Sequence, residues 1–125
     1  MVIALLVGAG GFIGAIARYG VNSGFAKLLN GQWLPYGTLT VNVVGCLIIG
    51  LVAGLIDHRQ IGSPELRAFI LIGILGGFTT YSAFGYETIN LFREGQITAA
   101  IVNVAIQIVL GLGAVWVGYK LATVG

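Results

Sequence analysis

Four long stretches without a charged residue constrain what this chain can fold into. They cover residues 1–17, 28–56, 68–86 and 97–119, and the third reaches residue 92 if Glu87 is tolerated. Each stretch is about 17 residues or longer, the length that a helix needs to cross a hydrocarbon layer roughly 30 Å thick. Charged residues make up only 8% of the 125 residues, against about 25% in soluble domains. The sequence therefore predicts an integral membrane protein.

The polar turns between these stretches are short, so we expect one all-α membrane domain with four transmembrane helices over residues 1–125. The approximate spans are 2–26, 36–56, 66–92 and 96–121, with Trp33, Pro35 and Tyr36 as an interfacial belt where the second helix starts. No catalytic domain fits in the remainder, so we do not expect an enzyme. The expected location is the cell (inner or cytoplasmic) membrane, as a multi-pass protein of the lipid bilayer.

The basic residues do not favour one orientation in the membrane. Three would lie on the side of the N-terminus and three on the opposite side: Arg59, Arg67 and Lys120 against Arg18, Lys27 and Arg93. The positive-inside rule then predicts insertion both ways, and two oppositely inserted copies can pair as an antiparallel dimer. A weak bias corrected by lipid or a partner protein is the alternative. The net charge of +2 is dispersed and too small to indicate nucleic acid as a partner.

Glycine pairs spaced four residues apart occur in three of the stretches. They are Gly10 and Gly14, Gly50 and Gly54, and Gly73 and Gly77. A pair of this kind lets another helix approach closely, because glycine has no side chain. We therefore expect these three helices to pack through their glycines.

Polar and small residues form a stripe along the second and the fourth stretch. These residues are Thr38, Asn42 and Gly45 in one, and Asn103, Gln107 and Gly111 in the other. An Asn inside a membrane helix costs free energy unless it finds partners. Asn42 is therefore either a link between helices or a donor to an anion in a water-filled vestibule. Arg18, at the end of the first stretch, either snorkels to the interface or raises the anion concentration near a pore mouth.

The third stretch is interrupted at its middle by GGFTTYSAF, residues 76–84. Its glycines have weak helix propensity, and its Thr and Ser hydroxyls can divert backbone hydrogen bonds. A broken helix at this depth must be buried in protein or line a site, because hydrocarbon cannot satisfy freed carbonyls, and such carbonyls are ligands for a hard cation. After the break, Tyr81 and Phe84 share one face. A kinked helix with aromatic packing is the alternative.

Three segments resemble the Fluc/CrcB family of fluoride channels: GGFIGAIARY (10–19), GTLTVNVVGCLIIG (37–50) and GGFTTYSAFGYE (76–87). The resemblance covers essentially the whole chain. It implies a dual-topology antiparallel homodimer that passively exports fluoride through two pores and so relieves fluoride toxicity. It also implies a structural sodium ion (Na+) at the dimer centre, held by the backbone carbonyls of Gly76 and Thr79 from both subunits.

The same resemblance implies roles for further residues. The fluoride pore would be lined by the Asn42 amide and the rings of Tyr81 and Phe84. Further candidate donors in the pore are Thr38, Thr80, Ser82, Asn103 and Gln107. Arg18 would attract anions in a vestibule. Fluoride is small and strongly hydrated, so a pore must replace its water by firm donors, to which ring edges add a positive potential. Tyr81 stands where the family usually has Phe, and the fourth-helix track, usually hydroxyl-bearing, consists here of Asn103, Gln107 and Gly111.

A small multidrug-resistance-like, proton-coupled exporter is the alternative function, because it shares the small size, the four spans and the dual topology. Such an exporter needs a membrane-embedded carboxylate in its first helix. No acidic residue precedes Asp57, and only Glu87 could lie at depth. The sequence therefore favours the channel.

Overall fold

The fold is helical throughout the part of the chain that the computed structural model describes, residues 1–28 and 34–124. Three helices are continuous: α1 (Val2–Leu28), α2 (Tyr36–Arg59) and α6 (Ile97–Thr123). The third spanning segment consists of α3 (Pro64–Arg67), the π-helix η1 (Ala68–Leu75), α4 (Gly76–Phe78) and α5 (Tyr81–Arg93). All four segments are long and apolar enough to cross a membrane, which confirms the predicted fold class. The interfacial role of Trp33 lies outside the described residues.

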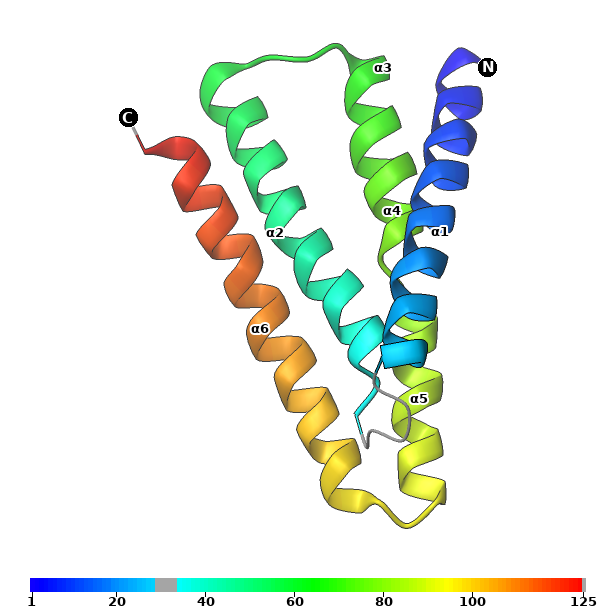
Figure 1. Ribbon diagram of the computed structural model, residues 1–125. Coiled ribbons are helices and arrows are strands. Elements are labelled where there is room, and N and C mark those ends of the chain that lie inside the picture. Colours follow the sequence, from blue (N-terminus) through cyan, green and yellow to red (C-terminus); the bar gives the residue numbers. More distant parts are fainter. Residues whose placement is uncertain (29–33, 125) are drawn as a thin grey trace.

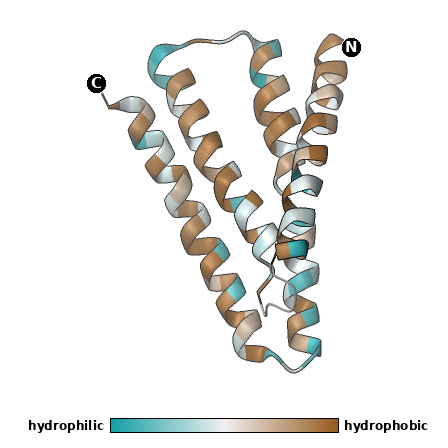
Figure 2. Ribbon diagram, viewed as in Figure 1, coloured by the Kyte–Doolittle hydropathy of each residue, from teal (hydrophilic) through white to brown (hydrophobic). Residues whose placement is uncertain are grey.

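The helices associate as two pairs (Figure 1). α1 packs along η1 and α4, and α2 packs along α6. Beyond the break in the third segment, α5 contacts α6 and so connects the two pairs. The start of α1 and the end of α6 lie at the end of the molecule where α2 connects to α3, and hydrophobic residues run along all four segments (Figure 2).

Glycines make the contact between α1 and the third segment close. A Cβ atom added to Gly10 would lie 2.8 Å from the backbone nitrogen of Ile74, and one added to Gly77 would lie 2.7 Å from the Gly11 carbonyl oxygen. Real Cβ atoms do not approach backbone atoms so closely, so a larger residue would push the helices apart. The predicted glycine packing is confirmed here.

The second pair of helices uses the same device. A Cβ atom added to Gly54 would lie 2.7 Å from the Ala122 Cβ, and one added to Gly50 would overlap the Val115 carbonyl. Gly118 of α6 is equally close to α2, since its added Cβ would lie 2.9 Å from the Leu51 nitrogen. Its contribution was not predicted, because the sequence does not show which helix faces α2.

The ends of the helices differ from the predicted spans by a few residues. α2 continues to Arg59, and the third segment begins at Pro64, earlier than expected. The Ser63 side chain accepts a hydrogen bond from the Leu66 backbone N–H, and Pro64 occupies the first turn, which together fix this start. The widened π-helical turns of η1 were not predicted, because their sequence, AFILIGIL, is uniformly apolar with one glycine.

Candidate functional site

The third segment breaks at Thr79 and Thr80, as predicted. Both residues have extended backbone, with φ and ψ of −86° and 159° for Thr79 and −150° and 115° for Thr80. The Thr80 hydroxyl then caps α5 by accepting a hydrogen bond from the Ala83 N–H at 3.2 Å, and it lies 3.3 Å from the Ser82 hydroxyl. The Thr79 hydroxyl donates to the Leu75 carbonyl at 3.0 Å. The Thr80 hydroxyl therefore satisfies an N–H group at the start of α5, whereas the Thr79 hydroxyl adds a bond to a carbonyl that also accepts from the Thr79 N–H.

The backbone carbonyls around the break differ in whether they accept a hydrogen bond. Gly77 O accepts a hydrogen bond from Arg18 Nε of α1 at 3.0 Å. Gly76 O loses its helical donor, because the Thr80 N–H donates to Asn42 Oδ1 at 2.8 Å instead. Within the described ranges, neither Gly76 O nor Thr79 O accepts a hydrogen bond. These two oxygens are therefore available to an external ligand.

Asn42 of α2 is paired with the broken backbone. Its Oδ1 accepts from the Thr80 N–H, and its Nδ2 donates to Thr80 O at 3.1 Å. Because a backbone N–H can only donate, the orientation of the amide is fixed. The second Nδ2 hydrogen goes to Gln107 Oε1 of α6 at 3.0 Å. Asn42 was predicted to be either a link between helices or a donor to an anion, and the geometry of the single chain favours the link between helices.

The polar stripes of α2 and α6 meet through this amide and continue to α5. Gln107 Nε2 donates to Asn103 Oδ1 at 3.4 Å, and Asn103 Nδ2 donates to Thr88 Oγ1 at 2.9 Å. The Thr88 hydroxyl donates in turn to the Phe84 carbonyl at 2.7 Å. Asn103 is only 1% exposed, so these bonds are needed to offset its burial. Thr88 was missed in the sequence, where a Thr four residues after Phe84 has an unremarkable spacing.

A second polar contact connects α2 with α5. The Thr38 hydroxyl donates to Glu87 Oε2 at 3.0 Å, and Thr38 is only 2% exposed. Glu87 Oε1 is buried and has no hydrogen-bond partner among the described residues. The sequence indicates that Glu87 could lie within the membrane span, but it does not identify Thr38 as its hydrogen-bond partner.

The two aromatic rings after the break lie together. The Tyr81 and Phe84 ring centroids are 5.8 Å apart with the planes tilted by 53°, within the range of an attractive aromatic pair. Phe84 is partly buried, whereas Tyr81 is 84% exposed. The pair therefore presents one ring to the chain and the other to its surroundings.

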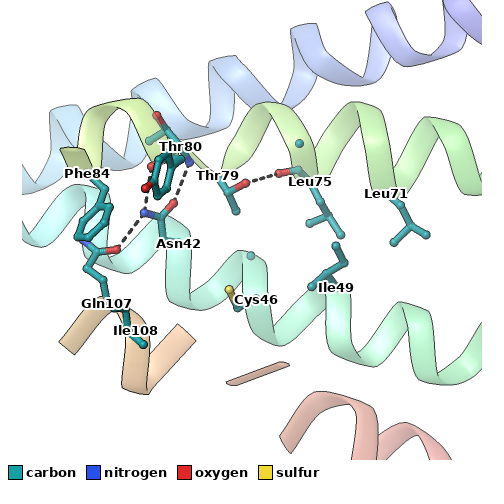
Figure 3. Close-up of a pocket in the computed structure, with 13 residues that line it drawn as sticks. Asn42, Cys46, Ile49, Leu71, Leu75, Thr79, Thr80, Phe84, Gln107 and Ile108 are labelled. Carbon is teal, nitrogen blue, oxygen red and sulfur yellow. Dashed lines mark hydrogen bonds between the residues drawn. The ribbon is translucent and has the colours of Figure 1, made fainter. Parts of the chain in front are cut away.

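These groups surround a cavity of about 340 Å³ between α2, the third segment and α6 (Figure 3). Seven of the predicted pore and sodium-site residues line it: Asn42, Gly76, Thr79, Thr80, Tyr81, Phe84 and Gln107. The rest of its wall is mainly apolar, with Cys46, Ile49, Leu71 and Leu75 among the lining residues. The other four predicted site residues are not part of the lining: Arg18, Thr38, Ser82 and Asn103. The cavity thus combines amide, hydroxyl and aromatic groups in an apolar surrounding.

These features define a small four-span membrane protein whose third helix is broken beside a partly polar cavity. The chain belongs to the CrcB-like family, whose model, described as "CrcB-like protein, Camphor Resistance (CrcB)", matches residues 5–119. Relatives named "Fluoride-specific ion channel FluC" align with this chain over nearly their full length. The one from Methylobacillus flagellatus is 43% identical over 118 residues, covering 94% of this chain and 91% of the relative.

Other relatives of the same name give a similar picture. The protein from Clostridium novyi is 40% identical over 124 residues, 99% of this chain and 96% of the relative. The protein from Paracoccus denitrificans is 47% identical over 114 residues, 91% of this chain and 89% of the relative. The family is one of ion channels, so the chain is not an enzyme, and its four spans make it a multi-pass protein of the cell membrane.

Proposed function

We propose that this chain forms a fluoride-selective channel that passively exports fluoride across the cytoplasmic membrane and so relieves fluoride toxicity. The observation that carries the proposal is the cavity beside the broken third helix, because it brings an amide N–H donor, the Thr80 hydroxyl and an aromatic pair together. Relatives of 40–47% identity that are named fluoride-specific ion channels support the same function.

The cavity chemistry suits a small anion that gives up its water. Gln107 and Thr80 supply N–H and O–H groups, and the edge of the Phe84 ring carries the positive part of its quadrupole. Chloride is larger, so close donors would reward it less than fluoride. Asn42 would contribute its amide only by exchanging a hydrogen bond that it makes within the chain. Thr38, Ser82 and Asn103 would act further along the path.

We propose that two copies assemble as an antiparallel homodimer with two pores. Tyr81 is 84% exposed in the single chain and lies near the middle of the third spanning segment. A phenolic hydroxyl facing hydrocarbon would lack a hydrogen-bond partner at a cost of several kcal/mol. A second copy would cover it, and the balanced distribution of Lys and Arg permits the opposite insertion that such a dimer needs.

Backbone carbonyl oxygens at the break could serve as ligands for a structural sodium ion at the dimer axis. The carbonyls of Gly76 and Thr79 accept no hydrogen bond from the described residues, and carbonyl oxygens suit hard cations. In the same part of the chain, no three His, Cys, Asp or Glu side chains come together to hold a metal ion. When bound, the ion would supply positive charge between two anion paths. Purification with a large organic cation in place of sodium would weaken the dimer, and an unaffected dimer would contradict this site.

The vestibule role of Arg18 remains a prediction. Its side chain is partly buried, and Nε is hydrogen-bonded to the Gly77 carbonyl at the break. The other guanidinium nitrogens would still carry charge toward an aqueous entrance.

Efflux from liposomes tests the function. The purified protein is reconstituted in vesicles loaded with potassium fluoride, and release is followed with a fluoride electrode after addition of a potassium ionophore. We expect rapid fluoride release and little chloride release from matched vesicles. Equal or faster chloride release, or no fluoride release, would overturn the proposal. Uptake of a cationic drug driven by a proton gradient would instead support the exporter.

A further inference from the structure

Four side chains form a continuous hydrogen-bonded relay that starts and ends on the backbone of the third segment. It runs from the Thr80 N–H through Asn42, Gln107, Asn103 and Thr88 to the Phe84 carbonyl, with donor–acceptor distances between 2.7 and 3.4 Å. The two ends of the relay bracket the first turn of α5. This turn carries the Tyr81–Phe84 ring pair.

The direction of every bond in the relay follows from its Thr80 end. The Thr80 N–H can only donate, so Asn42 must turn Oδ1 toward it and Nδ2 toward Gln107. Gln107 then accepts through Oε1 and donates through Nε2 (Figure 3 shows the Asn42–Gln107 bond). Reversing any one amide would bring two donors or two acceptors together, and buried groups left unpaired are costly.

The other end of the relay is consistent with this direction. The Thr88 hydroxyl donates its one hydrogen to the Phe84 carbonyl and offers its oxygen to Asn103 Nδ2. Asn103 then turns Oδ1 toward Gln107. The Thr80 N–H therefore sets the orientation of the Gln107 amide, and Thr88 holds the last amide of the relay in the matching orientation.

This orientation has a consequence for the cavity. An amide nitrogen has two hydrogens, and the described residues provide an acceptor for only one of those on Gln107 Nε2, namely Asn103 Oδ1. Gln107 lines the cavity together with Phe84, whereas the buried Asn103 does not. The second hydrogen of Gln107 is therefore a donor available to an anion.

We propose that Thr88 and Asn103 are positioning residues that hold Gln107 with an N–H group toward the cavity and fix the turn bearing the two rings. The relay makes this part of the cavity donate hydrogen bonds, which favours a small anion over a cation and over a larger anion. This inference rests on the proposed function, because it assigns the orientation of one donor for the transported fluoride.

Thr88→Val and Thr88→Ser are the matched pair that tests the relay. Valine keeps the branched shape but removes the hydroxyl, which leaves Asn103 Nδ2 without its partner on α5. Serine keeps the hydroxyl. We expect Thr88→Val to lower the ratio of fluoride to chloride release from liposomes about tenfold, the effect of losing one ordinary hydrogen bond. Thr88→Ser should retain the wild-type ratio.

Side-chain amide resonances provide a readout that does not depend on transport. In 15N-labelled protein in detergent micelles, Gln107→Met identifies the Gln107 NH2 pair of resonances. In the wild type, we expect this pair to shift on titration with potassium fluoride and not with potassium chloride. Before any fluoride is added, the pair should lie at a different chemical shift from the wild type in Thr88→Val and at the same chemical shift in Thr88→Ser. The wild-type titration is informative even if Thr88→Val does not fold.

The outcomes separate this inference from the function on which it rests. Wild-type liposomes that release no fluoride would contradict the proposed function, whatever the variants do. If wild-type liposomes release fluoride but the Gln107 amide resonances do not shift on fluoride titration, the proposed role of the relay is contradicted and the proposed function is not. A Thr88→Val protein with the wild-type ion ratio and unchanged amide resonances would overturn it as well.

Discussion

The glycine contacts and the polar contacts hold the same four helices together in opposite ways. The glycine contacts bring backbone against backbone within each helix pair, and they need only the absence of a side chain. The polar contacts join the two pairs at the break, where each amide or hydroxyl needs a particular partner on another helix. The glycine contacts determine which helices can be neighbours, and the polar contacts determine the shape of the cavity.

Removing the Asn42 amide should have the largest effect, because it lies at the centre of the polar contacts. Asn42→Leu leaves the N–H and C=O groups of Thr80 and the Gln107 oxygen unpaired. At about 1–3 kcal/mol for each of the three unsatisfied groups, we expect a loss of roughly 3–9 kcal/mol in the free energy of unfolding. Denaturation in detergent, followed by circular dichroism, measures this loss, and fluoride release should cease.

Asn42→Asp is the companion variant for this prediction. The carboxylate still accepts from the Thr80 N–H but sets an acceptor against the Thr80 carbonyl and the Gln107 oxygen. We expect it to be destabilised at least as much as Asn42→Leu, because acceptors that face one another in a buried site are costly. If Asn42→Leu unfolds at the same denaturant concentration as the wild type, Asn42 does not support the break.

Gly14→Ala tests the glycine contacts, with Gly8→Ala as its control on the same helix. A methyl group at Gly14 would overlap the Ile74 carbonyl, whereas Gly8 has no atom within 4 Å of the added Cβ. We expect Gly14→Ala to lower the free energy of unfolding by about 1–3 kcal/mol, the usual cost of overpacking. Gly8→Ala should be neutral or slightly stabilising in the same measurement. Equal stabilities of the two variants would show that α1 can shift at no cost.

The two kinds of contact also differ in how well the sequence predicts them. Charge-free stretches give the four spans, and the spacing of Gly10 and Gly14 identifies a packing face without knowledge of its partner. The break was predictable too, since GGFTTYSAF combines weak helix formers with hydroxyls. These features are local, and each depends on residues within one or two turns.

The partners of the polar groups were not predictable in the same way. Asn42 pairs with Thr80, and Thr38 with Glu87, across sequence separations of 38 and 49 residues. Such pairs depend on how far each helix rotates about its axis, which is set by packing over its whole length. Thr88 was missed for this reason, because only its neighbour Asn103 on α6 distinguishes it from a hydroxyl that bonds to its own helix.

Tyr81→Phe should have the smallest effect of these variants. It tests whether the polar contacts extend beyond the interior of the chain to the exposed Tyr81 hydroxyl. The Tyr81 hydroxyl makes no hydrogen bond with the described residues, and the variant keeps the ring that lies 5.8 Å from Phe84. We expect fluoride release equal to that of the wild type. Phe84→Ile is the contrasting variant, since it keeps apolar bulk but removes the ring edge in the cavity, and its release should fall sharply while the proposed dimer stays intact. Complete loss of release in Tyr81→Phe would show that the hydroxyl is required, and would extend the polar contacts from the interior of the chain to the surface that the proposed second copy would cover.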